Sequence, residues 1–324
     1  MSGSFREDDR RMKILITGAT GFIGRHLTLK LKLLGHELIT ISRRPVMRNK
    51  KDVKLSTHYA LDLGEVDRSK DSYYMFENIC RQHSPDLIFH LASNAVVKPD
   101  DDNPHGIILD NTISTQKVAH YAPEGCKVVL ASSVIVYGDW MFQQESPRPY
   151  TEEDRTEPTS IYGITKQASE GSIRYHSSTG QINGVSARMC ATVGRGLTHG
   201  VVYDFIRKIL NNPTLEALGS KPGSTKPYCY IEDLKSALIL LAMKDSAEGA
   251  YNIVPDDAIN IEQVAKAVMS GLEVYKNIEW LGDGANWKGD NKLISVSNDK
   301  LKSIGWTPKY SSKEAIFEAV RSMS

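Results

Sequence analysis

The chain has 324 residues, of which 40% are hydrophobic and 24% are charged, a composition ordinary for a soluble enzyme. Its 40 basic and 39 acidic residues give a formal net charge of +1, so nothing points to nucleic acid or an anionic membrane surface as a partner. No apolar run approaches the length that spans a bilayer. Four cysteines without paired spacing argue against a metal site or disulfides and predict reduced thiols in the cytoplasm: Cys80, Cys126, Cys190 and Cys229.

The first elements of the chain predict a strand, a glycine-rich turn and a helix. Residues 1–11 are polar and charged, and we expect a disordered extension there. Ile14–Thr17 has the pattern of a short buried strand, and Phe22–Leu34 can form a helix. The chain turns from the strand into the helix through three glycines, which allow a tight bend and close approach of a pyrophosphate to the helix N-terminus: Gly18, Gly21 and Gly24. Because the spacing is G-x-x-G-x-x-G, an ordinary strand-to-helix turn is an equal alternative at this point.

Strands and helices alternate through the first half of the chain. The expected strands are Ile14–Thr17, Glu37–Ser42, Lys54–Ala60, Leu87–Leu91, Lys127–Ser132 and Gly184–Arg188. The expected helices are Phe22–Leu34, Tyr73–His83, Ile107–Tyr121 and Ile161–Thr179. This alternation predicts an α/β fold with a Rossmann-like, doubly wound parallel sheet. We expect an NAD(P)-binding domain over 12–188 and a smaller substrate-binding lobe over 189–324, with some of its segments returning to the first domain.

The residues after the second expected strand bear on the choice of cofactor. At this position, about 20 residues past the glycines, an acidic side chain binds the ribose 2′-OH of NAD, whereas a nearby Arg accommodates the 2′-phosphate of NADP. The chain has Ser42, Arg43 and Arg44 here, and no acidic residue before Asp52. We therefore expect NAD or NADP, with NADP tolerated; the alternative is that both arginines lie in a solvated turn.

A tyrosine and a lysine four residues apart form the strongest chemical pattern. Tyr162 and Lys166 fall one turn apart on the same face of an expected helix. An ammonium near the phenol favours the phenolate and so lowers the tyrosine pKa. Tyr162 can then serve as general base toward a sugar hydroxyl, and its neutral form as general acid toward a ketone.

Four stretches together resemble the extended short-chain dehydrogenase/reductase family, in particular its NAD(P)-dependent nucleotide-sugar epimerases and dehydratases. They are TGATGFIG from Thr17, SSVIVYG from Ser132, YGITK from Tyr162 and LKSIGWTP from Leu301. The resemblance extends from about Met12 to the end of the chain. It implies bound NAD or NADP, a nucleotide-diphosphate sugar as substrate and a homodimer.

The resemblance also implies roles for individual residues. The catalytic residues would be Ser133, Tyr162 and Lys166, with Ser132 as the neighbouring alternative to Ser133. Besides Tyr162 and Lys166, the cofactor contacts would be Gly18, Thr20, Gly21, Phe22, Ile23, Gly24, Ser42, Arg43, Asp62, Leu63, Leu91, Ala92, Ser93 and Asn111. In this assignment Asp62 lies at the adenine, while Asn111 supports the catalytic site; from the sequence alone Asp62 is better explained as a turn residue.

The substrate positions depart from the family pattern. The implied contacts are Ser133, Val134, Arg188, Ala191, Lys226 and Lys288. Ala191 stands where the family has an asparagine on the diphosphate, and Lys226 replaces an arginine. A second expected arginine is missing, and Lys288 could substitute for it. Val134 and Ile135 replace the acidic pair that dehydratases use, so dehydration is disfavoured.

Three functions are compatible with these residues. The first expectation is a nucleotide-sugar 4-epimerase, in which C4 is oxidised transiently and re-reduced. The alternative is an NADPH-dependent 4-ketoreductase of a nucleotide-linked keto-sugar, which Ser42 and Arg43 favour. A non-catalytic cofactor-binding protein is disfavoured because Ser133, Tyr162 and Lys166 are all present.

Overall fold

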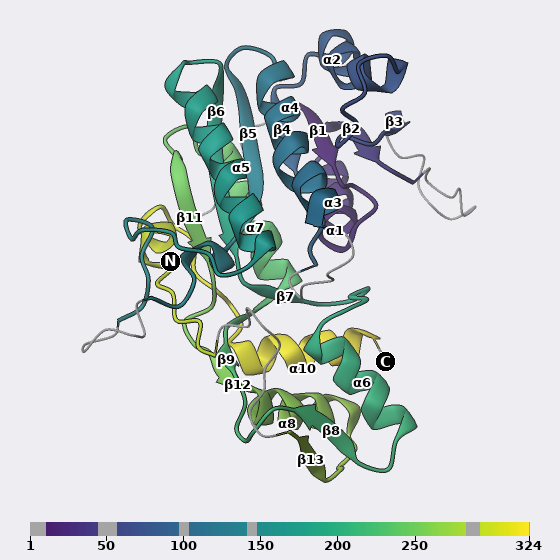
Figure 1. Ribbon diagram of the computed structural model, residues 1–324, viewed down its shortest axis with the longest axis vertical. Helices are drawn as coiled ribbons and strands as arrows, with labels where there is room; N and C mark the ends of the chain where they lie inside the picture. Colours follow the sequence, from purple (N-terminus) through teal and green to yellow (C-terminus); the bar gives the residue numbers. More distant parts are fainter. Residues whose placement is uncertain (1–10, 45–56, 97–103, 141–147, 283–291, 324) are drawn as a thin grey trace.

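A seven-stranded parallel sheet forms the centre of the molecule (Figure 1). The computed structural model describes residues 11–44, 57–96, 104–140, 148–282 and 292–323. The sheet order is β11-β6-β5-β4-β1-β2-β3. The bounds are β1 Lys13–Thr17, β2 Glu37–Ser42, β3 Thr57–Ala60, β4 Leu87–His90, β5 Cys126–Ser133, β6 Ile182–Met189 and β11 Gly249–Ile253. The predicted doubly wound α/β fold is thus confirmed, with the strand order reversing between β1 and β4.

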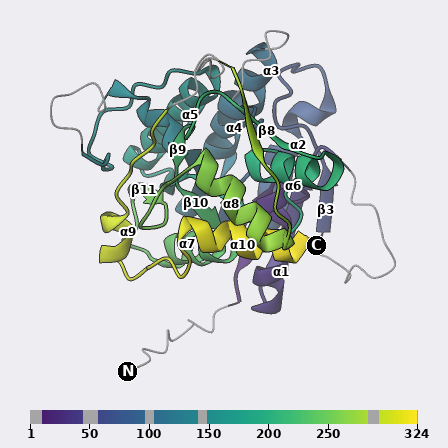
Figure 2. The same cartoon turned by 90° about the horizontal axis from the view of Figure 1, so that it is seen from below.

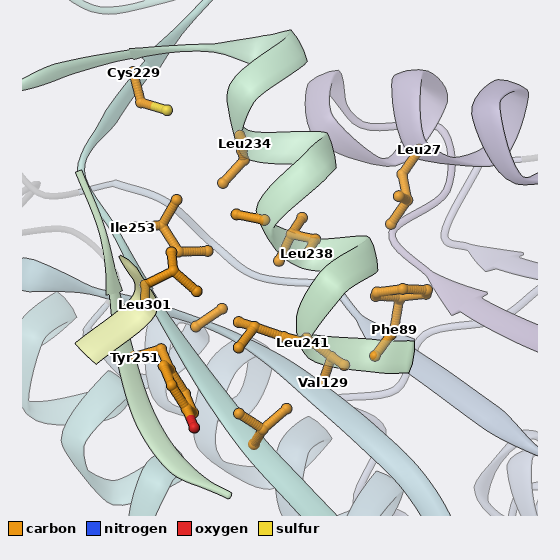
Figure 3. Packing of buried hydrophobic residues seen from close by; sticks show 14 of the residues in the cluster. Leu27, Phe89, Val129, Cys229, Leu234, Leu238, Leu241, Tyr251, Ile253 and Leu301 are labelled. Carbon is orange, nitrogen blue, oxygen red and sulfur yellow. The ribbon is translucent and has the colours of Figure 1, made fainter. Parts of the chain in front are cut away.

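Helices cover both faces of this sheet. One face packs against α1 (Phe22–Leu33) and α7 (Ile231–Met243), and the other against α2 (Asp71–His83), α4 (Ser114–Tyr121) and α5 (Ile161–Ser178). The alternation along β1 produces this arrangement, since Ile14 and Ile16 share one buried cluster with α7 while Leu15 belongs to another. Figure 3 shows the α7 side chains Leu234, Leu238 and Leu241 among residues of the sheet.

The helix expected over Ile107–Tyr121 differs from the prediction. It consists of α3 (Pro104–Ile108), a π-helical turn η1 (Leu109–Ile113) and α4. Asn111 is buried at the middle of this turn. The wider π turn changes which side chains face inward, and such turns are common at functional sites.

A second buried core lies beyond the carboxyl ends of the strands, below the sheet in Figure 1. Its helices are α6 (Val201–Asn211), α8 (Ile261–Leu272) and α10 (Ser312–Met323). Its short strand pairs are β7 (Ala191–Val193) with β10 (Tyr228–Tyr230), β8 (Leu215–Leu218) with β13 (Ile278–Leu281), and β9 (Thr225–Lys226) with β12 (Ile259–Asn260). Figure 2 shows α8 and α10 from below, in front of the sheet.

Segments of the C-terminal half also complete the sheet domain. β11 pairs with β6, and the short helix α9 (Asp299–Ser303) places Leu301 in the core beside α7. Trp306 of the LKSIGWTP stretch donates to the backbone oxygen of Asp233 at 3.3 Å and to Ser236 Oγ at 2.9 Å. These hydrogen bonds hold the LKSIGWTP stretch against the first turns of α7. No helix within the described ranges is long and apolar enough to cross a membrane.

Candidate active site and cofactor cleft

Two glycines where β1 turns into α1, Gly18 and Gly24, lie where a larger residue has no room. Gly18 has φ +68°, and a Cβ on it would lie 2.7 Å from the backbone nitrogen of Ala92. A Cβ on Gly24 would lie 2.2 Å from the oxygen of Gly18. The turn thus packs directly against the end of β4, and α1 begins at Phe22 with its first N–H groups directed into the same region.

A cavity of about 290 Å³ opens at the carboxyl ends of β1, β2 and β4. Ten of the predicted cofactor residues line it: Gly18, Thr20, Gly21, Ser42, Arg43, Asp62, Leu63, Leu91, Ala92 and Ser93. Arg44, which the sequence places beside Arg43, also lines it, and five lining residues were not predicted: Ile41, Leu61, Gly64, Asp110 and Ser114. Ile23 and Gly24 form the first turn of α1 instead, and Phe22 packs edge-on against His26. The cavity coincides with the point where the strand order reverses, the usual ligand position in such sheets.

Arg43, directly after β2, forms an ion pair with Asp110 of η1. Arg43 Nη1 lies 3.2 Å from each carboxylate oxygen of Asp110, although 60% of the Arg43 side chain is exposed. Ser42 Oγ donates to the backbone oxygen of Arg44 at 2.7 Å. Asp62 Oδ1 accepts from the Gly64 N–H at 2.9 Å, so Asp62 is both a turn residue and part of the cavity wall. The carboxylate near this end of the cavity therefore comes from η1 and not from β2.

His90 joins β1 to the end of β4. Its Nδ1 lies 2.8 Å from Thr17 Oγ1 and its Nε2 lies 3.1 Å from Thr115 Oγ1. Thr17 Oγ1 also accepts from the Ala92 N–H at 3.1 Å. Burial, with the Lys166 charge as a smaller cause, lowers the His90 pKa to about 3, so the imidazole is neutral at physiological pH. His90 is thus a buried, neutral link between Thr17 of β1 and Thr115 of α4.

Asn111 connects the cleft to the catalytic helix. Its Oδ1 accepts from Ser93 Oγ at 2.9 Å and from the Asn94 N–H at 2.7 Å. Its Nδ2 donates to Thr165 Oγ1 at 2.9 Å. Thr165 directly precedes Lys166 on α5, so the π turn positions the end of β4 and the catalytic helix together.

The structure brings Ser133, Tyr162 and Lys166 together at the end of β5. Ser160 Oγ accepts from the Gly163 N–H at 3.1 Å and so starts α5 directly ahead of Tyr162. Tyr162 lies close enough to Ser133 for the serine side chain to lower its pKa. Lys166 Nζ donates to the Ala131 backbone oxygen at 2.7 Å and lies 5.7 Å from the Tyr162 ring centroid. These contacts place a hydroxyl, a phenol and an ammonium close together.

The expected lowering of the Tyr162 pKa is wrong for this state of the site. Burial raises the pKa of Tyr162 to about 12, while the Ser133 hydrogen bond acts in the opposite direction. The Lys166 ammonium is directed at Ala131 rather than at the phenol. Burial lowers the Lys166 pKa to about 8, partly offset by Glu170, so the lysine stays mainly cationic at neutral pH.

Arg188, an implied substrate contact, lies in a buried ion pair behind the catalytic helix. Its Nη2 is 2.7 Å from Glu170 Oε2, and each side chain is only 7% exposed. Its Nη1 donates to the Tyr137 hydroxyl at 2.8 Å, and Ser132 Oγ donates to Glu170 at 2.5 Å. Burial alone would lower the Arg188 pKa, but the Glu170 hydrogen bonds and charge hold it above its usual value. Its position gives the guanidinium a structural role.

The other implied substrate residues lie at separate places. Val134 is 3% exposed in the short 3₁₀ helix η2 (Val134–Tyr137). Ala191 pairs with Tyr228, and Lys226 lies two residues before Tyr228 on β9. Lys288 lies outside the described residues, as does the expected extension 1–11 except for Arg11.

The family model "NAD dependent epimerase/dehydratase family" matches residues 14–254, about three quarters of the chain and including both the cleft and the catalytic helix. The chain belongs to this family. Its members are enzymes for which NAD is the named cofactor. This chain fits NAD, because Gly18 and Gly24 leave the turn without side chains and the adjoining cavity lies at the start of α1.

Individual relatives in the epimerase/dehydratase family have several different activities. The chain is 25% identical to UDP-glucuronic acid decarboxylase 1 of Danio rerio, over 99% of this chain and 74% of the relative. It is 24% identical to dTDP-4-dehydro-6-deoxyglucose reductase of Escherichia coli, over 98% of this chain and 99% of the relative.

Solved structures of the family share the fold over nearly the whole chain. A crystal structure of UDP-galactose 4-epimerase superposes with a TM-score of 0.78 at 27% identity, covering 96% of this chain and 98% of that one. The NAD complex of the Thermus thermophilus UDP-glucose 4-epimerase gives 0.81 at 24% identity, with the same coverage.

Proposed function

We propose that the chain is a nucleotide-sugar 4-epimerase that oxidises C4 of the sugar transiently and reduces it again from the opposite side. The observation that supports this most strongly is the placement of Tyr162 beside Ser133, close enough for Ser133 to lower its pKa, with Lys166 one turn away on α5. NAD, when bound, accepts the hydride from C4 and supplies it again for the return step. The 27% identity to a UDP-galactose 4-epimerase over nearly the whole chain also supports this function.

The residues of the chain handle the proton. Tyr162 takes the proton of the C4 hydroxyl during oxidation and returns it to the ketone oxygen during reduction. Ser133 holds this oxygen against Tyr162 by donating to it as negative charge develops. The raised pKa of Tyr162 provides the protonated form that reduction needs. Oxidation needs the phenolate form of Tyr162. A positively charged group close to the phenol would favour that form.

The residues after Ser133 argue against the dehydratase activity that the family description includes. Val134 and Ile135 are aliphatic, and Val134 is only 3% exposed. Neither can move a proton at a neighbouring sugar carbon, as the elimination of water requires, so we infer that the chain does not dehydrate its sugar.

We further propose that the lobe beyond the sheet binds the nucleotide diphosphate. Lys226 and Lys288 are the basic groups proposed for the phosphates, since Arg188 is already paired with Glu170. A lysine supplies a point charge rather than a bidentate fork.

A 4-ketoreductase is the second candidate. The similarity to the Escherichia coli dTDP-4-dehydro-6-deoxyglucose reductase spans both chains almost completely. Arg43 at the cofactor cavity could also accept the 2′-phosphate of NADP. Such an enzyme would use the same three catalytic residues but consume NADPH mole for mole with its keto-sugar.

One experiment separates the two candidates. Purified protein is incubated with UDP-glucose or UDP-galactose without added reductant, with Tyr162→Phe as the matched control. The epimerase interconverts the two sugars, and the phenylalanine variant loses about 10²-fold or more in turnover. Failure with these and a panel of other nucleotide sugars, together with NADPH oxidation by a nucleotide-linked 4-keto-sugar, would establish the reductase instead.

A further inference from the structure

The cofactor cavity contains a carboxylate that the sequence at the end of β2 does not reveal. Asp110 and Arg43 both line the cavity, and Arg43 Nη1 lies 3.2 Å from each oxygen of the Asp110 carboxylate. No acidic residue follows β2 before Asp52, so Asp110 of the π turn is the group that meets the arginine.

Asp110 is the better anchored partner of the pair. Its side chain is 16% exposed, compared with 60% for Arg43. Asn94 Nδ2 donates to its Oδ2 at 3.2 Å, and Ser114 Oγ donates to its backbone oxygen. The negative charge is therefore fixed in the cavity wall, whereas the arginine reaches it from the surface.

This arrangement affects the two nicotinamide cofactors differently. The 2′-phosphate of NADP would have to compete with Asp110 for the Arg43 guanidinium, and it would meet the like charge of that carboxylate. The 2′-hydroxyl of NAD is uncharged and bears neither cost. We propose that Asp110 determines cofactor specificity: it neutralises Arg43 and makes the native chain favour NAD over NADP. This inference rests on the proposed dinucleotide site, and it revises the preference expected from the arginines alone.

Asp110→Asn removes the charge while keeping the shape of the side chain. Isothermal titration of nucleotide-free protein gives the dissociation constants for NAD and NADP. We expect the variant to bind NADP at least about 10-fold more tightly than the native chain does. One charge-assisted contact to a phosphate typically changes the affinity by this factor. NAD binding should change by less than about 3-fold, because the 2′-hydroxyl of NAD carries no charge that interacts with the Asp110 carboxylate.

A double-mutant cycle tests whether Asp110 acts through Arg43. Arg43→Ala alone should weaken NADP, and in its background Asp110→Asn should lose most of its gain. Asp67→Asn is the matched control, because Asp67 contacts Ser69 and Lys70 and does not line the cavity. The same ratios are measured with 5′-AMP and 2′,5′-ADP, which differ only in the 2′-phosphate and lack the nicotinamide, so they report only the adenosine end.

The outcomes are distinct. A selective gain for NADP and 2′,5′-ADP that depends on Arg43 supports the proposal. An unchanged ratio, a loss of NADP affinity, or a full gain without Arg43 would overturn it. Normal NAD binding without epimerase activity would count against the proposed function alone, whereas absence of any dinucleotide binding would overturn both.

Discussion

Ser132 and Ser133 are adjacent at the end of β5, yet their hydroxyls belong to different networks. Ser132 donates to the buried Glu170, whereas Ser133 lies close enough to Tyr162 to lower its pKa. Successive residues of a strand point to opposite faces, so only one of the two can serve the cleft. The structure thereby favours Ser133 as the catalytic serine.

Alanine at each serine in turn tests this assignment. Ser133→Ala should reduce kcat by about 10²-fold, the loss of one positioned donor at the reacting oxygen. Ser132→Ala should leave kcat within a few-fold and lower the free energy of unfolding by about 1.5–3 kcal/mol, the usual contribution of a hydrogen bond to a charged group. Steady-state kinetics and urea unfolding measure both effects; equal losses of kcat would contradict the assignment.

The buried pair Glu170–Arg188 should support stability rather than substrate binding. Arg188→Met leaves the Glu170 carboxylate buried without its ion partner, which should cost about 3–5 kcal/mol in the free energy of unfolding. Combining it with Glu170→Leu should cost less than the two single changes together. A rise in substrate KM with unchanged stability would instead place Arg188 at the diphosphate.

Lys166 should make stability depend on pH. Its pKa of about 8 in the folded chain lies below the ordinary 10.5, so between these values the unfolded chain binds more protons and native stability rises with pH. Relative to Lys166→Met, the native chain should gain about 1.4 kcal/mol per pH unit within this window. Urea unfolding of both proteins from pH 7 to 10.5 measures the difference between their free energies of unfolding. A difference that does not change with pH would refute the lowered pKa of Lys166.

Lys226 should govern substrate affinity. Lys226→Ala should raise KM for the nucleotide sugar by about 10- to 150-fold, the weight of one charge-assisted phosphate contact. Lys221→Ala is the control, because Lys221 belongs to the same lobe and lies 3.4 Å from Glu262. Equal KM values for native chain and both variants would remove Lys226 from the diphosphate site.

The sequence predicts the parts of this site that depend on short segments. The glycines Gly18 and Gly24 and the pair Tyr162 and Lys166 are local patterns; the structure places the glycines at the turn beside the cavity and the pair on α5. The Arg43–Asp110 pair joins residues 67 positions apart and depends on a π turn that helical periodicity does not reveal.

Arg188 illustrates the same limit. Its place in a family motif indicated a ligand contact, but its partner Glu170 is identified only once α5 packs against β6. Asp110 could have been suspected from its position beside Asn111, but no sequence signal connects it to Arg43.

The central claim is that the hydride leaves C4 and returns to the same carbon within one enzyme molecule. UDP-galactose labelled with deuterium at C4 is converted without added cofactor, and the UDP-glucose formed is analysed by mass spectrometry and NMR. Our account predicts that the deuterium is retained at C4 and that Tyr162→Phe abolishes nearly all conversion. Loss of the label to solvent, or conversion that requires added NADPH, would contradict it.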